Sequence, residues 1–142
     1  MLYAVLCYNS EDSVFSWSKQ EEEAVMTKLI AAQEKMARAG KLGPVARLMP
    51  TTAATTLRKD REPAVVIDGP FAETKELVAG FWLWKCASLQ EAIDWVKSCA
   101  NPMPGDSEIE IRPIYAAEDF GDAFTPELRE QEERLRQEIA SS

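Results

Sequence analysis

The chain has 142 residues, of which 46% are hydrophobic and 28% are charged, a composition typical of one globular domain. The net charge of -8 provides no basic face for phosphate groups, so we expect neither nucleic acid nor a membrane as a partner. The chain contains no histidine, which excludes Ser-His-Asp and Cys-His catalysis and histidine-based zinc sites. We therefore expect no metal and no cofactor.

The cysteines and the apolar runs predict a cytoplasmic protein. The chain has three cysteines, an odd number that cannot all pair, and they are far apart in the sequence: Cys7, Cys86 and Cys99. We therefore expect reduced thiols and no disulfide framework. No apolar run approaches the roughly 18 residues that a membrane span requires. The first residues also lack the basic region of a signal peptide.

The first third of the chain predicts a strand, a helix and a second strand. Residues 2–8 form a continuous apolar run, typical of a strand at the centre of a sheet and buried on both faces. Residues 18–21 form a capping box that begins a helix, and Gly40 ends it. The apolar stripe of this helix consists of Val25, Leu29, Ala32 and Met36. A short strand is predicted at residues 44–49.

The middle of the chain predicts a hairpin and a further strand. Residues 53–58 and 64–67 flank the polar turn at residues 59–62, which indicates two paired strands. Residues 80–86 predict the next strand, with alternate side chains on opposite faces. One face carries Phe81 and Leu83, and the other carries Trp82 and Trp84.

A second helix and a final strand complete the predicted domain. Residues 88–91 form another capping box, and the helix that it begins ends at Asn101-Pro102. In the strand predicted at residues 108–115, Ile109 and Ile111 alternate with charged residues, so one face is polar.

The order β-α-β-hairpin-β-α-β predicts a ferredoxin-like α+β sandwich with an inserted hairpin. Both helices would cover one face of the sheet, and a homodimer is the simplest way to bury the other apolar face. We assign this domain to residues 1–117 and an acidic C-terminal helical extension to residues 118–142, which carry eight acids and three bases. The extension either lies on the body or across the dimer, or it frays as a tail.

Residues 68–76 (Asp-Gly-Pro-Phe-Ala-Glu-Thr-Lys-Glu) carry the strongest functional signal, because they place charged groups in a loop at the end of a strand. In one interpretation Asp68 caps its own turn, and Glu73, Lys75 and Glu76 form a solvated surface. In the other, Asp68 lies in a cleft and exchanges protons, with Lys75 as its electrostatic partner.

This segment resembles the signature of the DGPF proteins within the broader YCII-related family. Residues 54–58, 89–92 and 109–113 also resemble that family, so the likeness covers roughly residues 1–115 and leaves out the acidic tail. The resemblance implies a fold of the dimeric α/β barrel type, with Asp68, Glu73 and Lys75 as pocket residues.

The family's known members also bear on function. The broader family includes a dehydrochlorinase and carries a histidine–aspartate pair, which a chain without histidine cannot form. Members with the signature are associated with extracytoplasmic-function sigma factors, which implies a regulatory setting for this chain.

Further candidate pocket residues are Phe71, Thr74, Arg112, Trp82 and Trp84. Arg112 has a structural alternative in a surface ion pair with Glu110, and the two tryptophans have one in packing within the core or an interface. Four threonines have two interpretations: their hydroxyl groups could hydrogen-bond a ligand, or their β-branched side chains simply favour a strand. They are Thr51, Thr52, Thr55 and Thr56.

Two functional hypotheses follow. In the first, the protein is a small-molecule-binding homodimer and an enzyme in which Asp68 transfers a proton during an elimination or isomerisation. Lys75 or Arg112 would then hold an anionic substrate. In the second, it is a non-catalytic regulatory or protein-binding module associated with an extracytoplasmic-function sigma factor.

Overall fold

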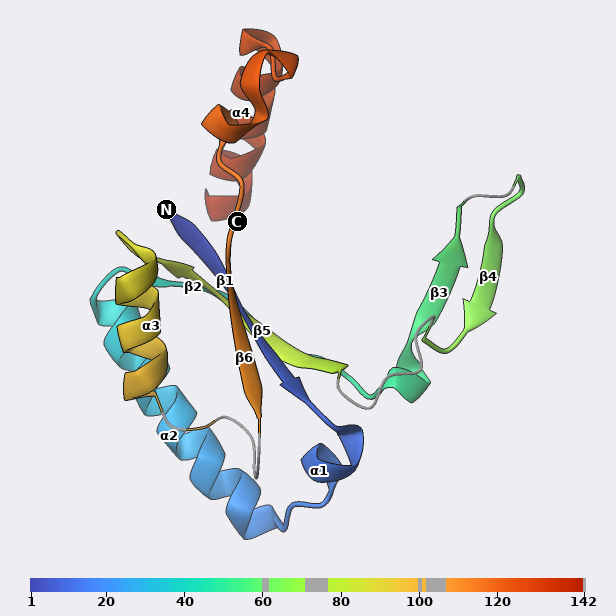
Figure 1. Cartoon of the computed structure of the whole chain (residues 1–142), viewed down its shortest axis with the longest axis vertical. Helices are drawn as coiled ribbons and strands as arrows, with labels where there is room; N and C mark the ends of the chain where they lie inside the picture. Colours follow the sequence, from blue (N-terminus) through green and yellow to red (C-terminus); the bar gives the residue numbers. More distant parts are fainter. Residues whose placement is uncertain (60–61, 71–76, 100, 102–106, 142) are drawn as a thin grey trace.

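A computed structural model describes residues 1–59, 62–70, 77–99, 101 and 107–141 of the chain. The order of helices and strands agrees with the sequence prediction, with short 3₁₀ turns and one short helix added (Figure 1). The strands are β1 (Leu2–Asn9), β2 (Leu42–Arg47), β3 (Thr55–Arg58), β4 (Val65–Asp68), β5 (Leu77–Lys85) and β6 (Glu108–Pro113). The helices are α1 (Glu11–Phe15), α2 (Lys19–Arg38), α3 (Leu89–Ser98) and α4 (Pro126–Ser141), and the 3₁₀ turns are Thr51–Ala53 and Ala117–Ala123.

Four strands form one antiparallel sheet in the order β2-β5-β1-β6, and β3 and β4 pair separately as a hairpin. The prediction that the apolar run of residues 2–8 is a central strand is confirmed, because β1 lies between β5 and β6. The predicted hairpin is also confirmed, with Thr55 opposite Asp68 and Arg58 opposite Val65. The chain therefore has a mixed α+β fold built on antiparallel sheets.

Both helices that cover the sheet begin at the predicted capping residues. Ser18 accepts a hydrogen bond from the Glu21 N–H, and the Glu21 carboxylate accepts from the Ser18 N–H, a complete capping box. At α3 the arrangement differs slightly: Ser88 accepts from the Glu91 N–H, but the Glu91 carboxylate accepts from the N–H of Ala87. Each cap satisfies backbone donors that the first helical turn leaves without a partner. Figure 1 shows α2 and α3 on the same side of the sheet.

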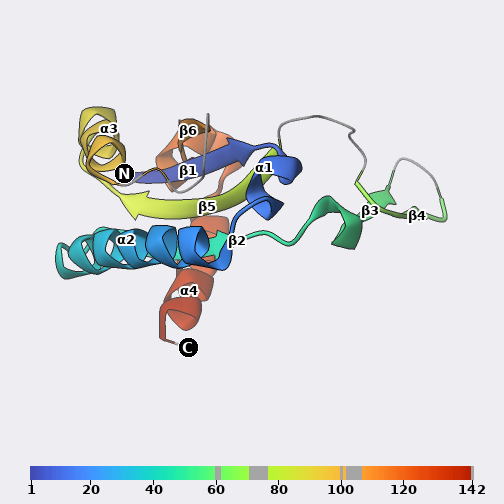
Figure 2. The ribbon, with the colours of Figure 1, turned by 90° about the horizontal axis from the view of Figure 1, so that it is seen from below.

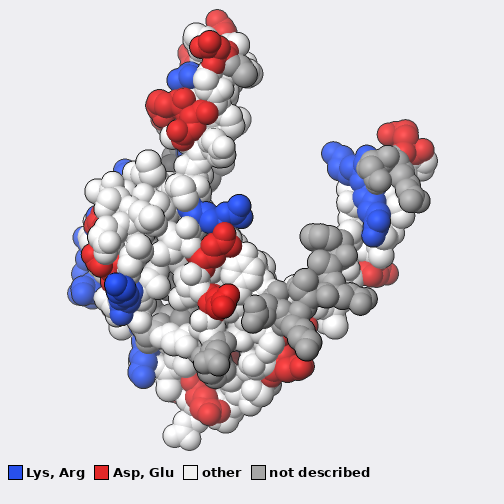
Figure 3. Space-filling model, in the orientation of Figure 1, with Lys and Arg blue, Asp and Glu red and all other residues white. Residues whose placement is uncertain are grey.

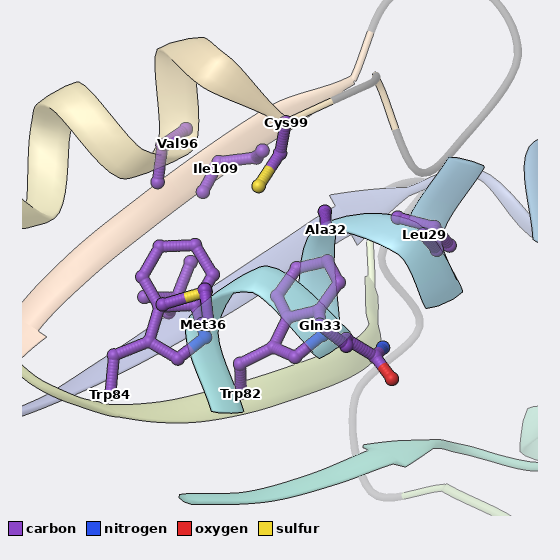
Figure 4. A pocket seen from close by; sticks show the side chains of 10 residues that line it. Leu29, Ala32, Gln33, Met36, Trp82, Trp84, Val96, Cys99 and Ile109 are labelled. Atoms are coloured by element: carbon purple, nitrogen blue, oxygen red, sulfur yellow. The ribbon is translucent and has the colours of Figure 1, made fainter. Parts of the chain in front are cut away.

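The hydrophobic core lies between the sheet and these two helices. Every second residue of β1 points into it, and Val5 is 0% exposed. Trp84 of β5 and Met36 of α2 are buried in the same cluster, and Trp82 packs against it from the side. Figure 4 shows the side chains of Trp82 and Trp84 next to one another on β5, with ring centroids 5.9 Å apart. The tryptophans thus face the helices, which was one of the two orientations that the sequence left open.

The opposite face of the sheet is covered by no helix of the described chain, and we call it the bare face. The register places on it Leu2, Ala4, Leu6, Tyr8, Phe81 and Leu83, together with Glu108, Glu110 and Arg112 of β6. The six residues of β1 and β5 are half-buried, whereas the three charged residues of β6 are exposed. In Figure 3 the surface over the strands is largely uncharged apart from a short column of acidic and basic atoms along β6.

Two segments extend away from the body: the β3–β4 hairpin and α4 (Figures 1 and 2). The predicted helical extension is therefore a helix, and its apolar residues Leu128, Leu135 and Ile139 are exposed. A cluster of Tyr115, Phe120 and Phe124 precedes it, with ring centroids 5.2 and 5.4 Å apart. No described helix has the length and apolar composition needed to cross a membrane.

Candidate functional site

The structure places Asp68 at the end of β4, in the hairpin that extends from the body, where it is exposed. The turn that follows is fixed by two hydrogen bonds. The Gly69 N–H donates to the Ala54 carbonyl at 2.8 Å, and the Thr56 hydroxyl donates to the Gly69 carbonyl at 2.7 Å. Gly69 has a φ of +102°, a conformation that side chains disfavour, so the glycine after Asp68 is required by this turn.

Of the other predicted pocket residues, the structure describes Arg112, Trp82 and Trp84, and it does not bring these three together. Phe71, Glu73, Thr74 and Lys75 lie outside the described residues. Arg112 is exposed on the bare face, where its guanidinium forms an ion pair with Glu110 at 3.3 Å. Trp82 and Trp84 lie on the helix-covered face, so the sheet separates them from Arg112.

A cavity of about 200 Å³ lies at the base of the hairpin, and we call it the hairpin-base cavity. Two of its lining residues connect it to the signature segment. Ala54 is hydrogen-bonded to Gly69, and Leu77 is the first described residue after residues 71–76. Its remaining lining residues are Asn9, Glu11, Leu48, Met49, Pro50, Thr51, Val78 and Ala79.

Asn9 is the most informative side chain of this cavity. It ends β1 and is only 5% exposed, and its side-chain oxygen accepts from the Ser10 N–H at 2.7 Å. Its amide nitrogen Nδ2 is buried and has no hydrogen-bond acceptor among the described residues. A buried donor without a partner costs roughly 1–3 kcal/mol, so a ligand oxygen in the cavity would offset that cost.

Glu11 supplies a carboxylate to the same cavity. It is the first residue of α1, a five-residue helix capped by Ser10. Its two oxygens accept from the N–H and the hydroxyl of Thr51, at 2.5 and 3.0 Å. These bonds connect the start of α1 to the turn before the hairpin. The cavity thus combines an amide donor, a fixed carboxylate and an apolar wall, which suits a small molecule with a carbonyl group.

The three cysteines are not candidates for a nucleophile. Burial raises the pKa of the Cys7 thiol from 9.0 to about 12, because the thiolate would lose its hydration. The pKa values of Cys86 and Cys99 are also raised, chiefly by burial. In the described part of the chain, no three cysteines or acidic residues cluster in a way that would hold a metal ion.

The sequence analysis missed Asn9 and Glu11 as site residues, although it named Thr51 for its hydroxyl group. The first strand was predicted over residues 2–8, which stops one residue before Asn9, and the short helix that follows was not predicted. Glu11 and Thr51 are 40 positions apart in the chain, so no local pattern reveals their contact. The useful signal is a polar residue at the end of an otherwise apolar central strand.

Comparison with known proteins gives two findings. The sequence model of the YCII-related domain matches residues 1–118, which is most of the chain. An uncharacterized protein of Rhizobium meliloti (strain 1021) is 56% identical over 114 residues, which cover 80% of this chain and 92% of that protein. The matched family region contains the sheet, the hairpin and the hairpin-base cavity, and it ends before α4.

Proposed function

The chain belongs to the YCII-related family, and from this premise we propose that it is a small-molecule-binding homodimer whose ligand site is the hairpin-base cavity. The observation that carries the proposal is the buried Asn9 amide, which has no acceptor among the described residues. In this proposal a ligand oxygen accepts from Asn9, and the apolar wall of Leu48, Met49 and Leu77 packs against the rest of the molecule.

Asp68 and Lys75 give this site its proposed chemistry. Asp68 acts as a general base that removes a proton from the bound molecule in an elimination or isomerisation, and Lys75 stabilises the charge that develops. The hydrogen bonds of Gly69 to Ala54 and Thr56 support this role, because they fix the turn after Asp68 beside the cavity.

The proposed dimer pairs two bare faces, as in ferredoxin-like proteins of the dimeric α/β barrel type. The strand order β2-β5-β1-β6, with both helices on one side, supports this architecture. Leu6 and Phe81 occupy the middle of the bare face, and burying such a surface against a second copy removes apolar area from water. Three free thiols support a reducing compartment such as the cytoplasm.

A thermal-shift screen against a metabolite library tests the ligand site. A ligand that binds the native protein raises its melting temperature. We expect compounds that stabilise the wild type to lose their effect in Asn9→Ala and to retain it in Asp94→Asn, a control at an exposed position on α3. Asp68→Asn should retain binding but abolish turnover of any compound that the wild type converts. Equal shifts in the wild type and Asn9→Ala would refute the assigned site.

The second candidate is a non-catalytic module that binds a protein, with an extracytoplasmic-function sigma factor as the candidate partner. The observation that favours it is α4, which extends from the body with exposed Leu128, Leu135 and Ile139 among mostly acidic residues. Such a helix suits an apolar groove with a basic rim. Calorimetric titration of the cognate sigma factor with the full chain and with a chain ending at residue 123 distinguishes the two candidates, because only this second function requires the tail.

A further inference from the structure

A second and larger cavity, of about 370 Å³, lies between α2 and the β2–β5 edge of the sheet. It shares only Ala79 with the hairpin-base cavity among the described lining residues. Helix α2 contributes residues at helical spacing, with Val25, Leu29 and Gln33 on one face. We call this space the α2 cavity.

The floor of the α2 cavity includes a glycine, Gly80 of β5. Gly80 lies opposite Cys7 of β1 and Arg47 of β2. A Cβ atom at Gly80 would lie 2.8 Å from the Ala46 carbonyl oxygen, so the close approach of β2 and β5 requires glycine. The floor at this position therefore consists of backbone.

The lining is mostly apolar. Trp17 and the helix-facing Trp82 line it, and Figure 4 shows Trp82 beside Gln33, which lines the α2 cavity as well. Met26 and Ile30 also line it and are 42% and 49% exposed, so they lie at its open side. The volume lies within the range of about 300–1,000 Å³ for small-molecule sites.

Two polar features define the group that a ligand would present. Trp17 lines the cavity, and its indole nitrogen Nε1 is buried with no acceptor among the described residues. Arg47 lines the same cavity, and its Nη1 donates to Glu22 at 2.8 Å. A guanidinium has five N–H donors, and Arg47 is half-exposed, so donors remain for a second acceptor. Glu22 also lines the cavity and is the acceptor that Arg47 already binds, so the remaining donors of Arg47 and the Trp17 N–H favour an acceptor group on the ligand.

We infer that the α2 cavity is a binding site for a small aromatic or alicyclic carboxylate. The ring packs between α2 and Trp82, and the carboxylate accepts from the Trp17 N–H and from Arg47. Aromatic walls favour a ring through edge-to-face packing, and an arginine favours a carboxylate over a cation or a neutral group. The site is independent of the proposed ligand of the hairpin-base cavity.

The test uses 2-naphthoate and 2-naphthylmethylammonium, which share a ring system and differ in charge. Isothermal titration calorimetry of the full-length protein should show binding of the naphthoate, with the cation at least tenfold weaker. Trp17→Phe keeps the ring and removes the donor, so it should weaken naphthoate binding by about threefold to tenfold. Arg47→Met should abolish the preference for the anion.

A second test compares a tryptophan substitution that fills the cavity with one at a neighbouring position outside it. Val25→Trp should abolish binding, and the neighbouring Ala24→Trp, at an exposed position that does not line the cavity, should retain it. If Val25→Trp fails to fold, Ile30→Trp closes the open side from a half-exposed position. Asn9→Ala should leave naphthoate binding unchanged, which separates this site from the hairpin-base cavity.

Three results would overturn the inference. The first is no naphthoate binding to the wild type at millimolar concentration. The second is equal binding to the wild type, Val25→Trp and Ile30→Trp. The third is binding that occurs only after residues 124–142 are removed, which would mean that the tail of a second copy occupies the cavity.

Discussion

The two faces of the sheet are built by the same strands but have different environments. On the helix-covered face, Tyr3, Val5 and Cys7 of β1 are 4%, 0% and 1% exposed. On the bare face, Leu2 and Leu6 of the same strand remain half-buried. The side chains are apolar on both faces, so hydrophobicity alone does not decide which face is buried within one chain. The connections decide it, because both helices return on the same side.

This comparison implies different consequences for mutations on the two faces. Residues of the helix-covered face stabilise the single chain. Residues of the bare face, in the proposed dimer, stabilise only the association of two chains. The predictions below test this distinction, from the largest expected effect to the smallest.

Trp84→Ala should cause the largest loss of stability, because it removes a buried ring from the core beside Met36. We expect the free energy of unfolding to fall by about 3–5 kcal/mol, measured by urea denaturation. The matched substitution is Leu83→Ala, on the bare face of the same strand. It should lower the unfolding free energy of the single chain by a smaller amount. Equal losses for both variants at low protein concentration would contradict the distinction.

Leu6→Glu should dissociate the proposed dimer while leaving the single chain folded. A carboxylate in the middle of a dry interface loses its hydration without gaining a partner, which costs several kcal/mol. Light scattering after size-exclusion chromatography should give twice the 15.9 kDa of one chain for the wild type and that mass for the variant. A wild-type mass of one chain would refute the dimer, and an unchanged circular dichroism spectrum controls for folding.

Ser18→Ala should cost about 1 kcal/mol of unfolding free energy, because it removes the acceptor for the Glu21 N–H at the start of α2. The helix covers only one face, so the mass in solution should not change. Ser16→Ala, two residues earlier and outside this cap, is the control: it removes only an exposed hydrogen bond from its hydroxyl to the Ser13 carbonyl and should cost less. A change in association state with Ser18→Ala would mean that the two faces are coupled.

Acid should lower the free energy of unfolding by protonating Glu91. The Glu91 carboxylate forms an ion pair with Lys41, which joins α3 to the residue just before β2. Hydrogen bonds from the Lys41 side chain and from the Ala87 N–H lower the pKa of Glu91 below its usual 4.5. The contribution of Glu91 to stability is therefore complete above the pKa of the unfolded chain, and it is lost as pH falls through the lower folded pKa.

Denaturation between pH 6 and pH 3 should thus show a decline that is smaller in Glu91→Gln. Glu34→Gln is the control, because the ion pair of Glu34 with Arg38 is exposed along α2. Identical pH profiles for the wild type and Glu91→Gln would show that Glu91 contributes nothing to the loss of stability in acid.

The parts of the fold that could be predicted are those specified by patterns among neighbouring residues. Apolar periodicity and the serine caps located the sheet strands and both covering helices, because caps and side-chain spacing depend on neighbouring residues. The second strand begins at Leu42, two residues before the prediction, because Pro44 sits at a register shift in an edge strand and does not end it. The short α1 carried too weak a pattern to be predicted.

The candidate site was less predictable for a physical reason. The signature segment indicated Asp68, but the cavity beside it depends on contacts between distant parts of the chain. Asn9 becomes a candidate only because the end of β1 is buried against the turn before the hairpin. Arg112 and Trp82 both seemed suitable for one pocket, but strand alternation places them on opposite faces of the sheet.

The β3–β4 hairpin leaves the sheet after β2 and returns to it at β5 without contributing a strand. The register of β2 against β5 is therefore independent of the number of residues in the hairpin. Insertions or deletions between β3 and β4 would cost only the small entropy of closing a longer loop. The arm that carries Asp68 can thus change in length while the core stays the same.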